Sequence, residues 1–350
     1  MNRRTFLRHA ALTTAGLMGG CAATPRAASD RIMTVTGPIA ASDLGRTLVH
    51  EHVVVDFIGA DRVQPQRYDS DQAWKTALPQ FQRLRSEGVK SLVECTPRYI
   101  GRNPALRRRL SESSGLQIVT NTGWYAAVNH KFLPPEARTE TADQIAARWL
   151  QEWSEGIEGT GIRPGFLKLG TGNGPLPEID AKLVRAAARV HRKTGLTIAI
   201  HTGDGAAALD ELRLLREEGV RPEALIWVHA QNDPGPIQIE AARLGAWISL
   251  DGYSLSGPNV LRYPRFLAAH REAGTLHRVL VSHDDGWAVE GDAPSGNRLA
   301  LFANGNSVPF QSIFTRLLPD LLAQGFTDAE LEQLLVSNPQ AALTLRIRQI

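Results

Sequence analysis

Two histidines separated by a single residue, His50 and His52, carry the clearest chemical signal of this sequence. They belong to the apolar, β-branched stretch 47–56, which is typical of a buried strand. Residues two apart in a strand point to the same face, so we expect both imidazoles to face one way. Two adjacent imidazoles form a pair of metal ligands. The alternative for each histidine is a core imidazole bonded to a backbone carbonyl.

Four more residues that can bind metal lie at or near the ends of other apolar runs. They are Lys168, His201, His229 and Asp284. Simpler roles exist: Lys168 could extend along the surface to water, and Asp284 could cap a helix. A lysine inside an apolar run is, however, seldom buried without a partner. The pattern points to a metal site only if the fold brings these residues together.

The order of the apolar segments predicts such a fold. After about residue 45, strand-like runs alternate with helical segments rich in Ala, Leu and Arg. The strand-like runs are 47–56, 89–95, 117–122, 165–169, 196–201, 224–229, 246–251 and 278–282. The clearest helical segments are 71–87, 141–157, 179–193, 206–218 and 262–273. Eight strand–helix units predict an α/β fold, a single (β/α)8 TIM barrel with C-terminal helices. A doubly wound sheet is the alternative, but it would need a glycine-rich phosphate turn that we do not find.

A barrel of this kind places its active site at the C-terminal ends of the strands. The six residues lie at or near such ends, so we expect them to meet at one mouth as a metal site. The neighbouring His283 should point the opposite way. The remaining histidines of the body receive no role.

The composition is that of an ordinary globular protein. The 350 residues are 43% hydrophobic and 21% charged, with a net charge of +3. No basic stripe with interleaved aromatic residues is present, which argues against a nucleic-acid partner. The consecutive arginines 107–109 are interpreted as a solvated helix face. Cys95 is expected to be an inert buried thiol, and Cys21 is the only other cysteine.

Residues 1–30 are predicted to be a removable leader, which leaves 31–350 as the mature domain. The segment 2–8, with Arg3 and Arg4, resembles a twin-arginine signal, a route that exports folded, cofactor-loaded proteins. The segment 17–21 resembles a lipobox. Cleavage before Cys21 with a lipid on its sulfur, and ordinary cleavage within 22–29, are both open. Either predicts a periplasmic protein, and Cys21 is the only expected link to a membrane.

With these motifs in view, the sequence resembles the phosphotriesterase-like branch of the amidohydrolase superfamily. The resemblance spans about residues 34–345. It rests on the His-Glu-His of 50–52, Lys168, the His-Thr-Gly of 201–203, the Ser-His-Asp of 282–284 and the Asn-Pro of 338–339. The resemblance implies a centre of two divalent metal ions. His50, His52 and Asp284 would hold the more buried ion, and His201 and His229 the more exposed one.

Lys168 has a special part in this implied centre. Converted to N6-carboxylysine by carbon dioxide, it would bridge the two ions. Imidazoles with oxygen ligands suit Zn²⁺, the metal that we expect, and also admit Mn²⁺ or Co²⁺. The implied reaction is hydrolysis by a bridging hydroxide, with Asp284 as the catalytic group that accepts its proton.

The substrate is expected to be a small ester. Tyr125 matches a tyrosine that reaches the metal-bound oxygen in lactonase members and is a second catalytic candidate. Gly252, by contrast, stands where lactonases of the family often carry arginine. We expect a lactone or related carboxylic ester, with an organophosphate triester as the alternative. A non-catalytic exported barrel that binds metal or ligand is the alternative of another class.

The residues of the substrate pocket carry the weakest sequence signal. Trp124, Trp287 and Arg298 are candidates. The segment 286–309 is rich in Gly and Asn, and is predicted to form a lid over the pocket. A monomer and a homodimer are both open.

The export prediction can be tested directly. Replacing Arg3 and Arg4 with lysines should trap the protein in the cytoplasm, because the twin-arginine receptor reads an address rather than a charge. Cell fractionation measures the outcome, and unchanged periplasmic accumulation would show another route. Labelling with radioactive palmitate, with Cys21→Ala as the control, separates a lipoprotein from a soluble product.

Overall fold

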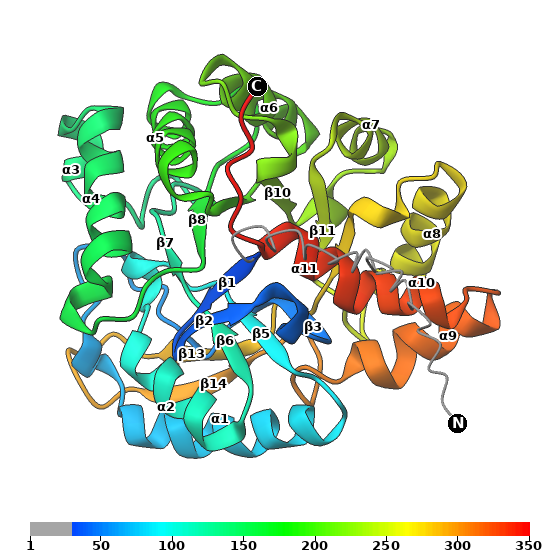
Figure 1. The fold of residues 1–350 in the computed structure, drawn as a ribbon. Helices are drawn as coiled ribbons and strands as arrows, with labels where there is room; N and C mark the ends of the chain where they lie inside the picture. The colour runs from blue at the N-terminus through cyan, green and yellow to red at the C-terminus, as the bar shows by residue number, and fades with distance from the viewer. Residues whose placement is uncertain (1–29) are drawn as a thin grey trace, which may run out of the picture.

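The computed structural model describes residues 30–350 (Figure 1). The predicted leader, with Arg3, Arg4 and Cys21, lies outside the described residues, so export stays a prediction. Over the described range, we find no helix that combines the length and apolar character needed to cross a membrane.

A closed ring of parallel strands forms the centre of the molecule. Its strands are β3 (Thr47–Glu51), β5 (Ser91–Glu94), β6 (Gln117–Val119), β7 (Asn121–Thr122), β8 (Phe166–Gly170), β9 (Thr197–His201), β10 (Leu225–Val228), β11 (Trp247–Leu250) and β12 (Val279–Val281). The hydrogen-bonded orders are β3-β5-β6 and β7 to β12 in sequence, all parallel. β6 and β7 are two parts of the third predicted strand. The Asp284 amide donates to the His50 carbonyl at 3.1 Å and closes the ring. The predicted (β/α)8 barrel is confirmed.

Helices surround this ring (Figure 1). The longer ones are α1 (Ser70–Ser86), α2 (Pro104–Ser114), α4 (Ala142–Glu155), α5 (Glu178–Thr194), α6 (Gly205–Glu217), α7 (Pro236–Leu244) and α8 (Asn259–Glu272). The short ones are α3 (Glu136–Thr139), α9 (Leu318–Ala323), α10 (Asp328–Glu332) and α11 (Asn338–Leu343). Their ends follow the sequence. Thr141 and Gln144 form a capping box at the start of α4, and Gly195 ends α5 with a φ of +75°.

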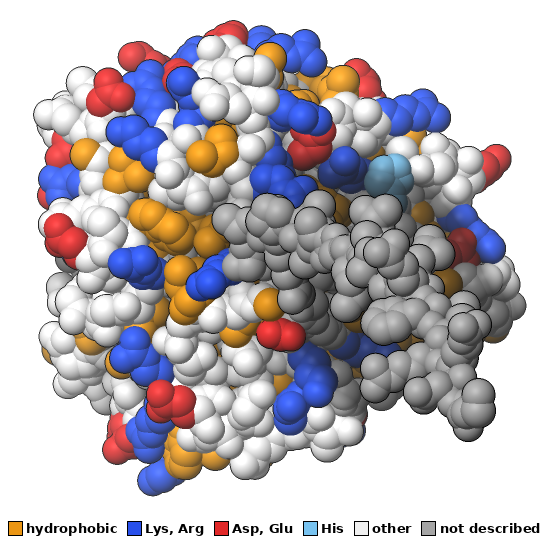
Figure 2. All heavy atoms as spheres, viewed as in Figure 1, with side chains coloured by type: hydrophobic (Ala, Val, Ile, Leu, Met, Phe, Trp, Pro, Cys, Tyr) orange, Lys and Arg blue, Asp and Glu red, His pale blue; other side chains and the backbone are white. Residues whose placement is uncertain are grey.

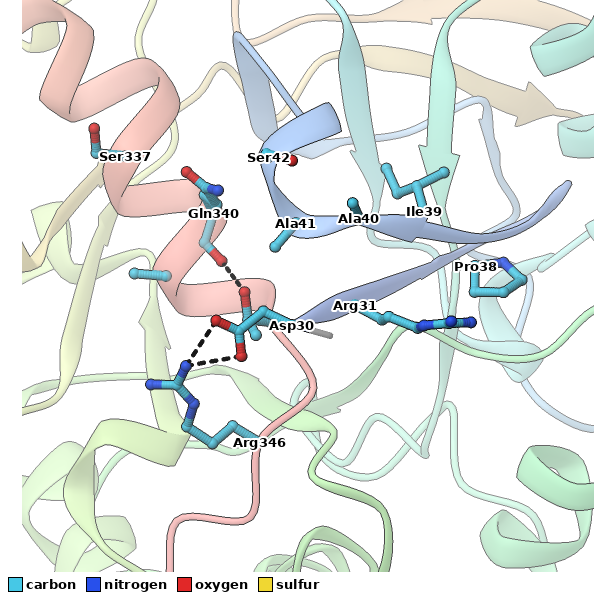
Figure 3. A pocket seen from close by; sticks show the side chains of 12 residues that line it. Asp30, Arg31, Pro38, Ile39, Ala40, Ala41, Ser42, Ser337, Gln340 and Arg346 are labelled. Atoms are coloured by element: carbon cyan, nitrogen blue, oxygen red, sulfur yellow. Dashed lines mark hydrogen bonds and ion pairs between the residues drawn. The ribbon is translucent and has the colours of Figure 1, made fainter. Parts of the chain in front are cut away.

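The N-terminal end of the barrel is covered. The hairpin of β1 (Arg31–Thr34) and β2 (Gly37–Ala40) lies with α11 across the centre of the ring in Figure 1. The Thr197 hydroxyl, at the first residue of β9, donates to the carbonyl of Ala342 in α11. A groove of about 820 Å³ runs between hairpin and helix, where Arg346 binds the Asp30 carboxylate (Figure 3). On the same face, Lys and Arg side chains lie among acidic and apolar ones (Figure 2).

A second small sheet lies beside the barrel and corrects two predictions. The first predicted strand, 47–56, breaks after β3, and β4 (Val54–Val55) pairs with β13 (Gly286–Glu290) instead. β13 forms an antiparallel hairpin with β14 (Arg298–Phe302). The predicted lid 286–309 therefore contains regular structure, because apolar side chains recur along both arms. Its Gly and Asn residues lie mainly in the connecting turn and after β14.

Arg67 connects this hairpin to the segment that follows β4. Its side chain is buried, and its Nε donates to the Asp56 carboxylate at 2.6 Å. Its terminal nitrogens donate to the carbonyls of Gly291 and Ala293 in the turn of the hairpin. One buried guanidinium thus joins the chain after β4 to the β13–β14 turn.

We predict that Arg67→Ala lowers the free energy of unfolding by about 3–5 kcal/mol, because Asp56 would stay buried without its cation. Urea unfolding of the mature protein measures the loss. Arg298→Ala is the matched control. Arg298 pairs with Glu290 on the same hairpin, but its side chain is 80% exposed, so the loss should stay below about 1 kcal/mol. Equal losses in the two variants would contradict the role of Arg67.

Candidate metal centre

Three predicted ligands lie together beside the closing contact of the ring. The Oδ1 atom of Asp284 is 2.9 Å from the Nε2 atom of His52 and 3.3 Å from the Nε2 atom of His50. One ligand atom of each residue lies within 4.8 Å of the other two. Two imidazoles and a carboxylate at this spacing form a set of ligands for one divalent ion.

The other predicted ligands lie next to this set. The rings of His201 and His229 are 4.5 Å apart between centroids, and His229 is 5.0 Å from His50. His201 ends β9, and His229 follows the last residue of β10. The ring of Tyr125 is 5.0 Å from His201. These residues meet at the C-terminal ends of the strands, as the barrel predicts.

Lys168 lies inside the same mouth, in the middle of β8. Its Nζ atom is 5.7 Å from the centroid of the Tyr125 ring. The side chain is only 2% exposed, and its one hydrogen bond within residues 30–350 is a long contact of 3.4 Å to the Leu169 carbonyl. Burial lowers the pKa of Lys168. Within residues 30–350, no carboxylate is in hydrogen-bond contact with the amine to balance an ammonium charge, which favours the uncharged form.

Asp251 is a site residue that the sequence analysis did not select. It follows β11 and is fully buried. Its carboxylate contacts the Nδ1 atom of His229 at 2.7 Å and that of His50 at 3.2 Å. Burial alone would raise the pKa of Asp251, but the two histidines hold it well below its usual range. An ionised Asp251 keeps the proton on each Nδ1, which leaves both Nε2 atoms free to bind an ion. The signal was available, because an aspartate ends the predicted strand 246–251 in the way that His201 and His229 end theirs.

His52 has a corresponding support from the neighbouring strand β5. Its Nδ1 atom is 2.8 Å from the Thr96 hydroxyl, which in turn donates to Glu94. Glu94 pairs with Arg107 of α2, and both side chains are buried. The interpretation of arginines 107–109 as a solvated helix face is therefore wrong for Arg107, which lies on the side of α2 that packs on the barrel.

The protonation states of Asp284 and Tyr125 differ for physical reasons. Burial would raise the pKa of Asp284, but hydrogen bonds with His50 and His52 and the charges of His50 and His229 lower it far below its usual range. Burial raises the pKa of Tyr125 far above its usual range. At neutral pH, the site therefore offers an ionised carboxylate that accepts protons and a neutral phenol that donates a hydrogen bond.

An aromatic wall of Phe57, Phe132 and Phe302 stands beside these residues. The Phe302 ring is 6.0 Å from that of His52 and 5.6 Å from that of Phe57. Phe132 lies 5.8 Å from Tyr125 and 6.1 Å from Phe57, again between ring centroids. Phe57 is 41% exposed, so part of the wall faces solvent. No short motif marks these positions, because the rings come from three separate segments of the chain.

The predicted pocket residues lie elsewhere, which corrects that prediction. Trp124 packs against Trp149 of α4 in the core, and Trp287 packs against Phe310. Arg298 points to solvent, where it pairs with Glu290. The alternative of a packing residue therefore describes both tryptophans, which are buried.

The histidines without a predicted role have protein partners. His283 does point away, with its Nδ1 atom 2.8 Å from Glu51. His130 contacts Asp180, and His191 contacts the carbonyl of Leu196. His270 contacts Thr275, and His277 contacts the carbonyl of Gly274.

Comparison with known proteins agrees with this architecture. Residues 30–343 match the model of the phosphotriesterase family. The phosphotriesterase homology protein of Escherichia coli (strain K12) is 29% identical over 299 residues, which cover 84% of this chain and 96% of that protein. The structure of an organophosphorus hydrolase from Deinococcus radiodurans is 31% identical, with a TM-score of 0.78, and covers 91% of this chain and 98% of its own.

A third similar protein is a mutant of a phosphotriesterase-like lactonase, also from Deinococcus radiodurans. Its structure is 31% identical, with a TM-score of 0.78, and covers 89% of this chain and 99% of its own. Because the family model covers most of the sequence, this chain belongs to the phosphotriesterase family. The resemblance predicted from the motifs is confirmed.

Proposed function

We propose that this member of the phosphotriesterase family is a metal-dependent hydrolase of ester bonds, with a lactone or related carboxylic ester as substrate. The observation that carries the proposal is the meeting of five strand-borne or strand-end ligands and one buried lysine at a single mouth. A core histidine needs one hydrogen-bond partner and no second imidazole beside it. The packing of four imidazole rings in series, those of His52, His50, His229 and His201, therefore favours metal binding.

The residues fit a centre of two divalent ions. His50, His52 and Asp284 would hold one ion, and His201 and His229 the other. When bound, two such ions would supply Lewis acidity and lower the pKa of a water molecule between them. Zn²⁺ is the metal that we propose, and Mn²⁺ or Co²⁺ would suit the same ligands.

The buried amine of Lys168 supports a bridging role. An ammonium there would be repelled by two dications in a site of low effective dielectric. Conversion to N6-carboxylysine removes the cation and places two oxygen ligands at the tip of the side chain. Burial lowers the pKa of the amine, so a larger fraction of it is uncharged at neutral pH, and the uncharged amine is the form that reacts with carbon dioxide.

Two side chains would act on the reacting groups. Asp284 is ionised at neutral pH and is oriented by His50 and His52, so it can accept a proton from the attacking water. Tyr125 keeps its proton and lies beside His201, so it can donate a hydrogen bond to the oxygen of the scissile group. Each group thus has the protonation state that its role requires.

The aromatic wall and the lactonase among the similar structures support the proposed substrate class. Phe57, Phe132 and Phe302 offer an apolar surface to the acyl or alkyl part of an ester. The organophosphorus hydrolase of similar fold keeps a phosphotriester as the alternative substrate. Gly252, in place of the arginine of many lactonases, also leaves that alternative open. A non-catalytic barrel would need none of the protonation states described for Asp284 and Tyr125.

The proposal predicts close to two divalent ions per chain in protein expressed with zinc or manganese. Elemental analysis of the mature protein checks this. The loaded protein should hydrolyse members of a panel of lactones and aryl esters faster than phosphotriesters. Faster turnover of phosphotriesters would favour the alternative substrate. Two ions without any turnover would favour the binding barrel, and absence of metal would overturn the proposed centre.

Lys168 provides a sharper test. Lys168→Ala should lower metal occupancy and remove most of the activity, because the bridge is lost. Acetate or propionate should restore part of both by occupying the vacated space. Lys168→Arg is the control that should not respond to added acid, because the guanidinium keeps its charge and fills that space. Full metal content and unchanged turnover in Lys168→Ala would contradict the bridging role.

A further inference from the structure

The backbone of Asp284 is strained at the point where its side chain enters the metal site. Its φ angle is +63°, in the left-handed region. A non-glycine residue pays roughly 1–2 kcal/mol for this conformation. Such residues persist where surrounding contacts over-determine them, and they concentrate at functional sites. The strain therefore raises the question of which contacts hold Asp284 in place.

His229 shows how this protein solves the same problem elsewhere. Its φ angle is +62°, again left-handed. The buried carboxylate of Asp251 accepts from its backbone amide at 3.1 Å and contacts its Nδ1 atom at 2.7 Å. A single buried carboxylate thus fixes both the backbone and the ring of a strained ligand.

Glu51 occupies the matching position for Asp284. It lies on β3 between His50 and His52, so its side chain leaves the strand on the opposite face. The side chain is fully buried. Its Oε1 atom accepts from the His283 amide at 3.1 Å, and its Oε2 atom accepts from the Asp285 amide at 2.9 Å. One carboxylate therefore binds the amides on both sides of Asp284.

Two side-chain donors complete this arrangement. The Ser282 hydroxyl donates to Oε1 of Glu51 at 2.7 Å and accepts from the His50 amide at 3.0 Å. The Nε2 atom of His283 accepts from the Ile313 amide, so the proton of this ring lies on Nδ1 and is donated to Glu51. Four donors from the three residues Ser282, His283 and Asp285, which flank Asp284, thus converge on one buried carboxylate.

We propose that Glu51 is a positioning residue, which holds the strained segment 282–285 so that the Asp284 carboxylate reaches the ion bound by His50 and His52. The inference rests on the proposed metal centre. It assigns Glu51 to that ion and not to the one near His201, because the described side-chain hydrogen bonds of Glu51 go to segment 282–285, which carries Asp284.

The test uses Glu51→Gln in the full mature chain. Glutamine keeps the shape, but its NH2 group replaces one acceptor oxygen and meets a buried N–H or O–H donor. The apo-protein is titrated with Co²⁺ alone, and binding is followed by visible absorption. One ion should bind about 10–100-fold more weakly than in the wild type, the usual effect of losing the support of a ligand. The affinity for the other ion should change by less than about threefold.

Glu152→Gln is the matched control. Glu152 is another largely buried carboxylate, and its partners Arg102 and Thr122 are not metal ligands. Its variant should lose thermal stability but keep the affinity of both ions. If the two variants lost stability and metal affinity in the same proportion, Glu51 would be structural only and the inference would fail.

A double-mutant cycle with Asp284→Asn separates positioning from general destabilisation. If Glu51 acts through Asp284, adding Glu51→Gln to Asp284→Asn should change Co²⁺ affinity by less than about threefold. A full additive loss would overturn the inference.

A milder variant covers the case in which Glu51→Gln does not fold. Ser282→Ala removes one of the four donors, and it should weaken the same single ion by a smaller factor. Unchanged affinity for both ions in Ser282→Ala would then contradict the inference. If the wild type binds no Co²⁺ at all, the proposed metal centre is wrong. If the wild type binds Co²⁺ and Glu51→Gln binds it equally well, only the inference about Glu51 is wrong.

Discussion

Buried carboxylates that accept several hydrogen bonds are the interaction on which the rest of this structure depends. A metal site at the mouth of a barrel needs ligands whose rings and backbones cannot rotate. Asp251 meets this need for His50 and His229, and Glu94 meets it for His52 through Thr96. Glu51 binds both amides that flank Asp284. Each carboxylate accepts several hydrogen bonds, which offset the cost of burying it.

Backbone hydrogen bonds next to these carboxylates close the barrel. The ring of strands is completed between β3 and the segment after β12, where the Asp284 amide donates to the His50 carbonyl and the His52 amide donates to the Asp285 carbonyl. Three of the four residues in these bonds are proposed ligands of one ion. The fold and the metal centre therefore share this closing contact, and an ion bound there would stabilise the closed ring as well as activate water.

The sequence could predict the features that rest on repeated apolar runs and on the polar residues at the ends of those runs. The strands, the barrel and the positions of Lys168, His201 and His229 followed from apolar runs with a polar end. The break between β3 and β4 did not, because β4 leaves the barrel to pair with a strand more than 200 residues away. Arg107 and the aromatic wall were missed for a related reason. In the sequence, three consecutive arginines are typical of a solvated helix face, and three scattered phenylalanines are typical of core residues. Only the tertiary packing shows that Arg107 is buried and that the phenylalanines lie beside the site.

The backbone strain at Asp284 and His229 connects the fold of the barrel with the geometry of the metal site. Both left-handed residues follow a barrel strand, where the chain must turn sharply to aim a ligand back into the mouth. A glycine would make that turn without strain, but it has no ligand atom. The site therefore needs a residue that is poorly suited to its backbone, and the buried carboxylates supply the compensating hydrogen bonds. Lys168, in the middle of a regular strand, needs no such support for its backbone, and its constraint is electrostatic instead. The site therefore carries two kinds of energetic cost. Backbone strain is carried by Asp284 and His229 after their strands, and the cost of burying a charge is carried by Lys168 inside the ring.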